Sequence, residues 1–140
     1  MGRLNADAGS LRRIPDMTIV TWNVNSVRAR EARLLAWLAE RQPDVVCLQE
    51  LKGTEATFPF EAVQALGYHA VVHGQPTYNG VAILSRTPPT DVVRGLADGV
   101  EDPQARLVAA DVGGVQVVCV YVPNGRSEEH TSELQSRQSI

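Results

Sequence analysis

The chain has 140 residues and a mass of 15.2 kDa, which suits one ordinary domain and excludes most multi-domain arrangements. Hydrophobic residues make up 44% of it and charged residues 21%, proportions that are typical of a folded globular protein and exclude a disordered or fibrous chain. The formal net charge of −3 excludes an overall positive field, so a polyanionic partner would have to be held by a local site.

Residues 1–16 contain no continuous apolar stretch, which is unlike a secretory signal. No apolar run reaches the roughly 20 residues that a membrane-spanning helix needs. Cys47 and Cys119 both lie in apolar, strand-like runs, which predicts free buried thiols in a reducing compartment. We therefore expect a cytoplasmic protein without membrane contact, in which residues 1–17 form a disordered extension ahead of the domain.

The first elements read as strand, helix and strand. Residues 18–22 are β-branched and aromatic, which predicts a strand. Residues 27–42 have apolar side chains at helical spacing, which predicts an amphipathic helix with its N-cap at Asn25 or Ser26 and its end before Pro43.

A second strand follows at residues 44–50, and its apolar middle predicts burial on both faces. A helix between these two strands predicts a βαβ unit with parallel strands. The remaining patterns predict a short helix at residues 60–66 and strands at 68–72, 80–85, 106–112 and 115–122, the last two joined by a Gly-Gly turn. We expect a mixed sheet that begins parallel and turns antiparallel, in an α/β or α+β fold.

Two oxygen-bearing side chains stand at the carboxyl ends of the parallel strands, where ligands gather in such units. These are Asn23 and Glu50. Carboxylate and amide oxygens suit a hard cation such as Mg²⁺, with water and substrate phosphate completing its coordination. The alternative is structural: Asn23 as a turn or cap residue and Glu50 as an exposed strand end.

The first helical turn carries Arg28 and Arg30, although the helix macrodipole disfavours cations there. An anion bound at this helix N-terminus by the backbone N–H groups and the two guanidinium groups would explain them. The alternative is that both side chains lean into solvent at a small cost. The residues by themselves leave both interpretations open.

The motifs Thr-Trp-Asn23-Val-Asn-Ser-Val-Arg28 and Pro-Asp-Val-Val-Cys-Leu-Gln-Glu50-Leu-Lys52 resemble the exonuclease III family of the endonuclease/exonuclease/phosphatase superfamily. Further matches lie around Leu-Gly-Tyr68, Tyr78-Asn-Gly-Val-Ala-Ile-Leu-Ser-Arg, Ala-Arg106-Leu-Val and Val-Tyr121-Val-Pro-Asn-Gly. The resemblance covers residues 18–125, which we therefore predict to be a partial domain of this superfamily.

The resemblance implies a four-layered α/β sandwich of the DNase I-like type, in which two sheets pack face to face with helices outside. It also implies a nuclease that uses Mg²⁺ or Mn²⁺ to hydrolyse phosphodiesters of double-stranded DNA. Such an enzyme incises apurinic/apyrimidinic (abasic) sites and digests 3′ ends as a 3′-to-5′ exodeoxyribonuclease. We expect the parent protein to be a monomer that takes part in DNA repair.

The same resemblance implies roles for individual residues. Glu50 is the metal ligand, Asn23 belongs to the metal and catalytic cluster, and Tyr121 contacts the scissile phosphate. Arg106 lies close to that phosphate. DNA-backbone contacts are expected at three further positions, which are Arg28, Lys52 and Asn124.

Several aromatic residues could stack on bases, but their strand or helix spacing favours packing in the core. We expect core packing for Trp22, Trp37, Tyr68 and Tyr78.

The composition changes abruptly after Gly125. Residues 126–136 read Arg-Ser-Glu-Glu-His-Thr-Ser-Glu-Leu-Gln-Ser and resemble the in-frame translation of a widely used sequencing-library adapter. A solvated natural terminus is the alternative. We expect residues 126–140 to be a non-native tail and the natural sequence of this fragment to end near Gly125.

The family's later catalytic residues, an Asp-x-Asn strand end and a terminal Asp-His pair, follow the position of Gly125. We therefore expect one of the two sheets to be largely missing, with the inner face of the other exposed, including residues 115–122. An isolated chain of this kind should be inactive and prone to aggregate.

Two other functions stay open at this stage: another phosphoesterase of the superfamily, acting on a sugar phosphate, lipid or RNA, and a binding module without catalysis. Arg28, Lys52 and the loop after Tyr121 favour nucleic acid. The presence of both Asn23 and Glu50 argues against a module that has lost catalysis.

Overall fold

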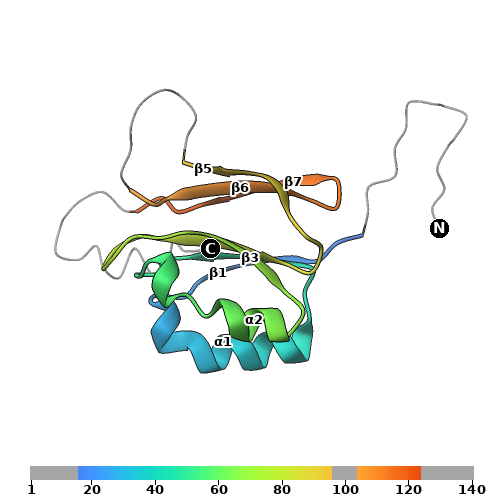
Figure 1. The fold of residues 1–140 in the computed structure, drawn as a ribbon, viewed down its shortest axis with the longest axis horizontal. Coiled ribbons are helices and arrows are strands. Elements are labelled where there is room, and N and C mark those ends of the chain that lie inside the picture. The colour runs from blue at the N-terminus through green and yellow to red at the C-terminus, as the bar shows by residue number, and fades with distance from the viewer. Residues whose placement is uncertain (1–15, 96–103, 124–140) are drawn as a thin grey trace, which may run out of the picture.

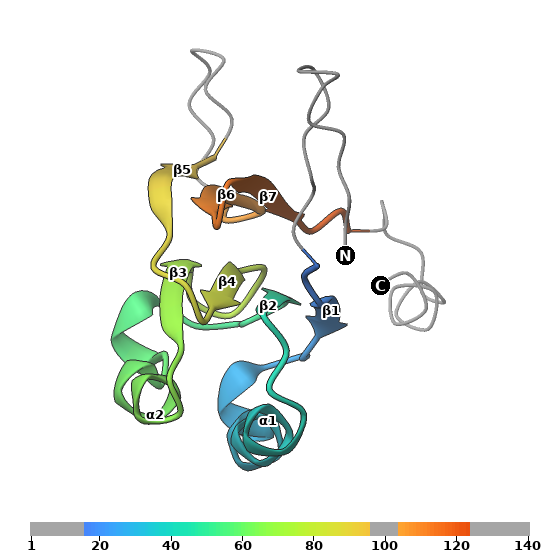
Figure 2. The ribbon, with the colours of Figure 1, turned by 90° about the vertical axis from the view of Figure 1, so that its right-hand side faces the viewer.

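The computed structural model describes residues 16–95 and 104–123 (Figure 1). These form three layers: two sheets packed face to face and a layer of helices on the outer side of the first sheet (Figure 2). The predictions for residues 1–15 and for residues 124–140, among them the DNA contact of Asn124 and the non-native tail, lie outside the described residues.

Seven strands, two α-helices and one 3-10 helix make up the described part. In chain order they are β1 Ile19–Asn23, α1 Val27–Arg41, β2 Val45–Gln49, η2 Glu55–Thr57, α2 Phe60–Ala65, β3 His69–His73, β4 Val81–Ser85, β5 Thr90–Arg94, β6 Leu107–Val112 and β7 Val115–Val120. Every predicted helix and strand is confirmed to within two residues, whereas η2 and β5 were not predicted.

The first sheet has the strand order β1-β2-β4-β3. β1 and β2 are parallel, which confirms the βαβ unit, and the other two pairings are antiparallel. All five residues of β2 are buried, as the apolar run predicted, because helices cover one face of the strand and the second sheet covers the other (Figure 2).

Helix α1 fixes the path between the two parallel strands. Its apolar stripe buries Leu34 and Leu38 against the first sheet. The Ser26 hydroxyl accepts a hydrogen bond from the Ala29 N–H, so Ser26 and not Asn25 is the N-cap. Gln42 adopts the left-handed conformation that ends the helix before Pro43.

The second sheet has the order β5-β6-β7 and is antiparallel throughout. The expected mixed sheet, which begins parallel and turns antiparallel, is confirmed for β1 to β4, but the expectation that β6 and β7 belong to it is wrong. β2 and β4 are buried on both faces, so the first sheet offers a second apolar surface, and the inner side chains of β6 and β7 pack on it. Gly113 and Gly114, at φ 57° and 84°, make the tight turn between β6 and β7.

The expectation that one sheet is largely missing, so that the inner face of the other, including residues 115–122, is exposed, is also wrong: the described residues form both sheets, and the inner face of β7 is buried. The inner residues Val117 and Cys119 of β7 are 6% and 1% exposed. The outer residues Val118 and Val120 are 51% and 43% exposed, because no described helix covers that side of the sheet (Figure 1). The uncovered apolar surface is therefore the outer face of this sheet.

Cys47 and Cys119 are free and buried, as expected for core thiols. Within residues 16–95 and 104–123 there is no helix long and apolar enough to cross a membrane. Tyr68 is buried, and Trp22 and Trp37 are partly buried against the helical core.

Tyr78 is 65% exposed, so the expectation that it packs in the core is wrong. It lies in the loop before β4, next to an Asn-Gly turn signal that takes the chain away from strand geometry.

Candidate active site

The ends of β1 and β2 lie side by side and stay joined beyond the sheet. Asn23, the last residue of β1, is in register with Gln49, and Glu50 follows directly. The Val24 N–H donates to the Gln49 carbonyl at 3.0 Å, and the Ser26 N–H donates to the Glu50 carbonyl at 2.8 Å. The two predicted site residues therefore occupy neighbouring strand ends.

The backbone at these ends has an uncommon conformation. Asn25, Ser26, Glu50 and Lys52 have φ values of 49°, 88°, 58° and 58°. Each such residue without the freedom of glycine costs about 1–3 kcal/mol and persists only where its surroundings impose it. Four of them at one end of a sheet indicate that this loop cluster is shaped for a site.

A third loop supports the strand end of β2. The Leu51 N–H donates to the Gly80 carbonyl at 3.1 Å, and the Lys52 N–H donates to the Asn79 carbonyl at 2.9 Å. A Cβ at Gly80 would lie 2.8 Å from Leu51 Cβ, and Gly80 has φ 99°, so glycine is required for this close approach.

Tyr121 links the second sheet to the strand end of the first. Its hydroxyl donates to Glu50 Oε2 at 2.5 Å, and its backbone N–H donates to the Arg106 carbonyl at 2.8 Å. Burial raises the pKa of Tyr121, the adjoining Glu50 carboxylate raises it further, and the nearby Arg106 guanidinium lowers it. The phenol therefore stays protonated and donates at neutral pH.

Arg106 is held at the edge of the same site. One of its terminal nitrogens donates to the Gln104 side-chain oxygen. Its Nε is buried and has no hydrogen-bond partner within the described residues. A buried donor of this kind favours an additional acceptor.

Asn23 has a structural role. Its Oδ1 accepts a hydrogen bond from the Asn25 N–H at 3.1 Å, which is the turn geometry offered as the alternative interpretation. The amide oxygen has a second lone pair, so this bond is compatible with a role as ligand, which stays a prediction.

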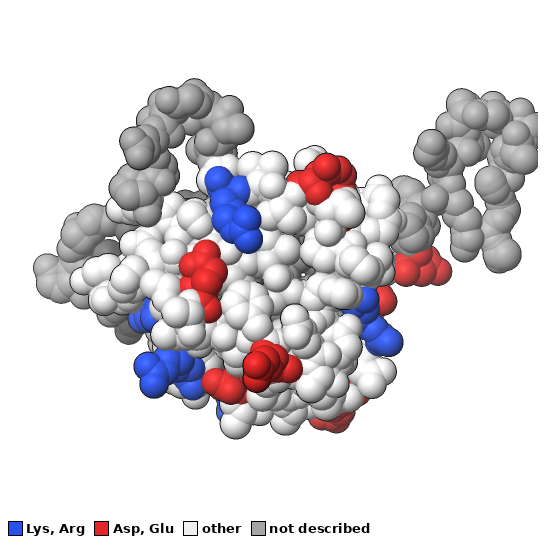
Figure 3. Space-filling view, viewed as in Figure 1, with Lys and Arg blue, Asp and Glu red and all other residues white. Residues whose placement is uncertain are grey.

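Lys52 and Arg28 flank the strand ends on the solvent side. Lys52 Nζ donates to Asn25 Oδ1 at 2.7 Å, and this bond directs the ammonium group toward the site end of α1. Arg28 is exposed, and the first turn of α1 contains no acidic residue. On the face shown in Figure 3 acidic and basic side chains are interspersed, so that face offers no basic patch for DNA.

The donors fit a hard divalent cation held by few protein ligands. Glu50 supplies a half-buried carboxylate, and Asn23 supplies an amide oxygen on the neighbouring strand. Within the described residues there is no group of three or more His, Cys, Asp or Glu side chains suited to a metal ion. One carboxylate and one amide oxygen would suit the mode in which Mg²⁺ is bound by one or two side chains, with water and substrate phosphate completing the coordination.

Two supporting residues were not predicted. Asn25 orients Lys52, and Gln104 orients Arg106. The sequence offered only the Asn-Val-Asn-Ser cluster as a turn signal for the first, and no signal for the second.

Fold and site together define a sandwich protein that carries a carboxylate at the ends of its parallel strands, facing a tyrosine from the opposite sheet. The chain belongs to the endonuclease/exonuclease/phosphatase family, whose profile matches residues 20–137. This confirms the resemblance seen in the sequence.

Two curated relatives are nucleases. Exodeoxyribonuclease III of Haemophilus influenzae is 36% identical over 128 residues, covering 89% of this chain and 48% of the relative. The DNA repair nuclease APEX1 of Danio rerio is 32% identical over 117 residues, covering 80% of this chain and 38% of the relative. The chain therefore spans half or less of the length of the curated relatives that it matches.

Solved structures show the same fold. The 3′-5′ exonuclease NExo of Neisseria meningitidis matches with a TM-score of 0.76 and 45% identity over 86% of this chain and 48% of that one. An AP endonuclease of Archaeoglobus fulgidus matches with a TM-score of 0.75 and 36% identity over 87% of this chain and 48% of that one. The expected DNase I-like fold is confirmed; the described residues form three of its four expected layers, and the chain spans about half of these solved structures.

Proposed function

We propose that this chain is the amino-terminal part of a DNA-repair nuclease that hydrolyses phosphodiesters of double-stranded DNA, at abasic sites and from 3′ ends. The observation that carries the proposal is the hydrogen bond from the Tyr121 hydroxyl to Glu50, which brings a phenol of one sheet to a carboxylate of the other. The names of the relatives support the same reaction class: exodeoxyribonuclease III, DNA repair nuclease and AP endonuclease.

In this proposal Glu50 and Asn23 hold a Mg²⁺ or Mn²⁺ ion. When bound, the ion supplies positive charge to the phosphoryl oxygens. When substrate is bound, the Tyr121 hydroxyl turns its single hydrogen from Glu50 to the scissile phosphate, and burial, which raises its pKa, keeps the phenol protonated at neutral pH. Arg106 presents its unpartnered Nε to the same anion.

Arg28 and Lys52 bind the DNA backbone on the solvent side of the strand ends, and Asn124 is assigned the same role from the family motif. Contacts to phosphates position the duplex without reading its sequence. A parent with these contacts should therefore bind DNA with a strong dependence on salt and little dependence on sequence.

The test joins residues 18–125 to the carboxy-terminal half of the Neisseria meningitidis exonuclease, in place of that protein's own amino-terminal half. We expect this chimera to cut a duplex with a single abasic site in Mg²⁺ and to be inactive in a chelator. Glu50→Gln should lower the rate by at least about 100-fold. Glu40→Gln, which changes an exposed carboxylate on α1, is the matched control and should leave the rate unchanged.

A folded chimera that binds duplex DNA but does not cut it would contradict the proposed activity. Equal rates for the Glu50→Gln and Glu40→Gln variants would contradict the role of Glu50. The 140-residue chain by itself should not cut this substrate, because it spans only half of the relatives' length.

A further inference from the structure

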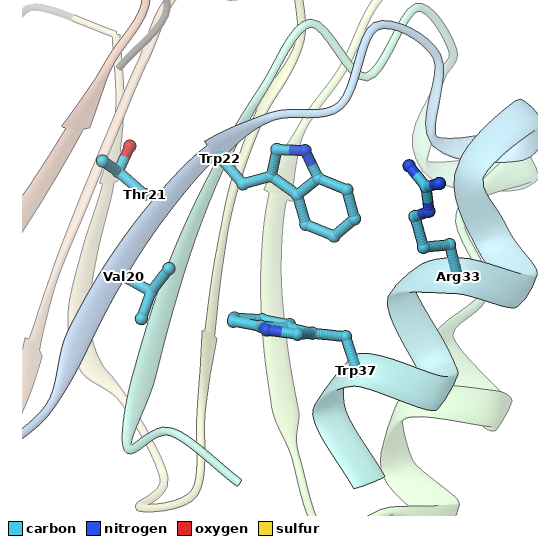
Figure 4. A pocket seen from close by; sticks show the side chains of 5 residues that line it. All are labelled: Val20, Thr21, Trp22, Arg33 and Trp37. Carbon is cyan, nitrogen blue, oxygen red and sulfur yellow. The ribbon is translucent and has the colours of Figure 1, made fainter. Parts of the chain in front are cut away.

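Two arginines of the described chain line surface hollows, and they are placed differently. Arg33 of α1 is exposed and lies beside Trp22 and Trp37 at a hollow of about 290 Å³ on the outer side of β1 (Figure 4). Arg106 lines a hollow of about 200 Å³ with Tyr121, and its Nε is buried. Keeping a long side chain in one position costs conformational entropy, and a backbone free to move would add to that cost. The position of Arg106 therefore depends on how its backbone is held.

Ala105, the residue before Arg106, is bound through both of its backbone polar groups. Its N–H donates to Gln75 Oε1 at 2.6 Å, and its carbonyl accepts a hydrogen bond from the Gly80 N–H at 2.8 Å. Ala105 is fully buried, so these two groups depend on protein partners rather than on water. Gln75 and Gly80 both lie in the loop between β3 and β4, and this loop therefore fixes the segment that leads into β6.

The same loop is bound to the end of β2. The Gly80 carbonyl accepts a hydrogen bond from the N–H of Leu51, which directly follows Glu50. Asn79 Nδ2 donates to Gln75 Oε1 at 3.0 Å, so the oxygen that holds the segment before β6 also holds the loop itself. A continuous run of hydrogen bonds thus leads from the strand end of the first sheet, through the loop, to the start of the second sheet.

We propose that Gln75 is a positioning residue for the reaction: by holding Ala105, it fixes where Arg106 lies relative to Glu50. This inference rests on the proposed function, in which Arg106 presents its Nε to the scissile phosphate and Glu50 holds the metal ion. Tyr121 shares the same support, because its backbone N–H donates to the Arg106 carbonyl at 2.8 Å. Gln75 itself is half-buried in the loop and acts through these residues.

The chemistry of the glutamine side chain suits this task. Its amide oxygen has two lone pairs, so it accepts from the Ala105 N–H and from Asn79 at once, and it brings no charge that would repel a phosphate. Methionine has a similar length but only a weakly accepting sulfur, so Gln75→Met removes the support with little change of size. Glutamate keeps the acceptor oxygens, so Gln75→Glu should keep the support.

The first test measures the order of the Arg106 side chain in the 140-residue chain and needs no activity. We expect the order parameter of the Arg106 Nε–H bond, from nitrogen relaxation, to fall from about 0.85 to below about 0.6 in Gln75→Met and to stay high in Gln75→Glu. Gln64→Met, the same change on the exposed surface of α2, is the matched control and should leave it high. Equal order of Arg106 in the Gln75→Met and Gln64→Met variants would overturn the inference.

The second test measures cutting of the abasic duplex by the chimera with the Neisseria half. Gln75→Met should lower kcat by at least about tenfold and change KM by less than about threefold, because a misplaced phosphate contact is lost mainly in the transition state. Gln75→Glu should recover most of kcat, and Gln64→Met should leave both constants unchanged. A loss of kcat that Gln75→Glu does not recover would contradict a role through the acceptor oxygen.

A double-mutant cycle separates positioning from a general effect on the fold. If Gln75 acts through Arg106, Gln75→Met should cost little more once Arg106→Ala is present. Its full cost should persist beside Arg33→Ala, because Arg33 lies at β1, across the first sheet from the edge strand β3. Losses that multiply in both backgrounds would overturn the inference. A chimera that does not cut DNA would contradict the proposed function instead, and the order of Arg106 would still decide whether Gln75 positions it.

Discussion

The two sheets of this molecule differ in what covers them. The first sheet packs helices on one face and the second sheet on the other, and the residues of β2 and β4 are all buried. Among the described residues, nothing covers the outer face of the second sheet, and every residue of β5 is exposed. A sheet covered on one side depends on its neighbour for its hydrophobic stabilisation, so we conclude that the first sheet with its helices is the stable unit and the second is held by it.

The largest effect is expected when a buried leucine of the first sheet and an exposed valine of the second are each replaced by alanine. Leu48 of β2 is fully buried on the helical side, so Leu48→Ala should lower the free energy of unfolding by about 2–5 kcal/mol. Val118→Ala, on the bare face of β7, should change it by no more than about 0.5 kcal/mol. Urea denaturation measures both, and equal losses would show that the two sheets are covered alike.

The hydrogen bond that joins the two sheets at the site can be removed while the aromatic ring of Tyr121 is kept. Tyr121→Phe deletes the hydroxyl that donates to Glu50 and should lower the free energy of unfolding by about 1.5–3 kcal/mol, as hydrogen bonds to charged groups do. Tyr78→Phe is the control, since that side chain is 65% exposed and should contribute almost nothing. If the Tyr121 variant is as stable as the original chain, the hydrogen bond between Tyr121 and Glu50 does not help to hold the two sheets together.

The stable unit should also have a characteristic response to alkaline pH. Tyr68 donates to the Pro43 carbonyl at 2.5 Å; burial raises its pKa, Arg86 lowers it and Asp44 raises it further. Above pH 10 the unfolded tyrosine releases its proton while the native one keeps it, so the free energy of unfolding falls as pH rises. Tyr68 contributes at most about 1.4 kcal/mol per pH unit to this fall, and Tyr121, whose pKa is also raised, adds to it. Tyr68→Phe should flatten this fall in denaturation curves recorded from pH 8 to about 11, whereas an unchanged slope would exclude Tyr68 as its source.

The smallest effect expected concerns the start of α1. Ser26→Ala removes the cap of the Ala29 N–H and should cost about 1 kcal/mol. Ser26→Asp, which keeps an acceptor at the cap and adds a favourable charge, should recover that loss. Thermal melts of the two variants measure the difference, and identical melting temperatures would mean that the first turn does not limit the stability of the helical layer.

Local patterns were enough to predict most elements of the fold. Alternating and helical periodicity predicted β1, α1 and β2, because each buries a regular set of apolar side chains. Periodicity does not say which sheet a strand joins, and for that reason β6 and β7 were expected in the same mixed sheet as β1 to β4. β5 was missed because its residues are all exposed and its pairing with β6 is irregular between Thr90 and Val93.

The positions of two site residues could be predicted from strand topology alone. The rule that carboxyl ends of parallel strands meet at one edge placed Asn23 and Glu50 correctly. The contact between Glu50 and Tyr121 joins residues 71 positions apart in different sheets, so spacing could not predict it. The family resemblance assigned both residues to one site but did not predict this hydrogen bond. Tyr78 was misplaced because the turn chemistry of the Asn-Gly pair after it outweighed strand propensity.

The central claim is that Glu50 is the metal-binding carboxylate of a nuclease site. The most direct test is the affinity of the folded chimera with the Neisseria half for Mn²⁺, measured by electron paramagnetic resonance without substrate. We predict that Glu50→Gln weakens Mn²⁺ binding by at least about tenfold, whereas Glu40→Gln leaves it unchanged. Equal affinities for the two variants would contradict the account.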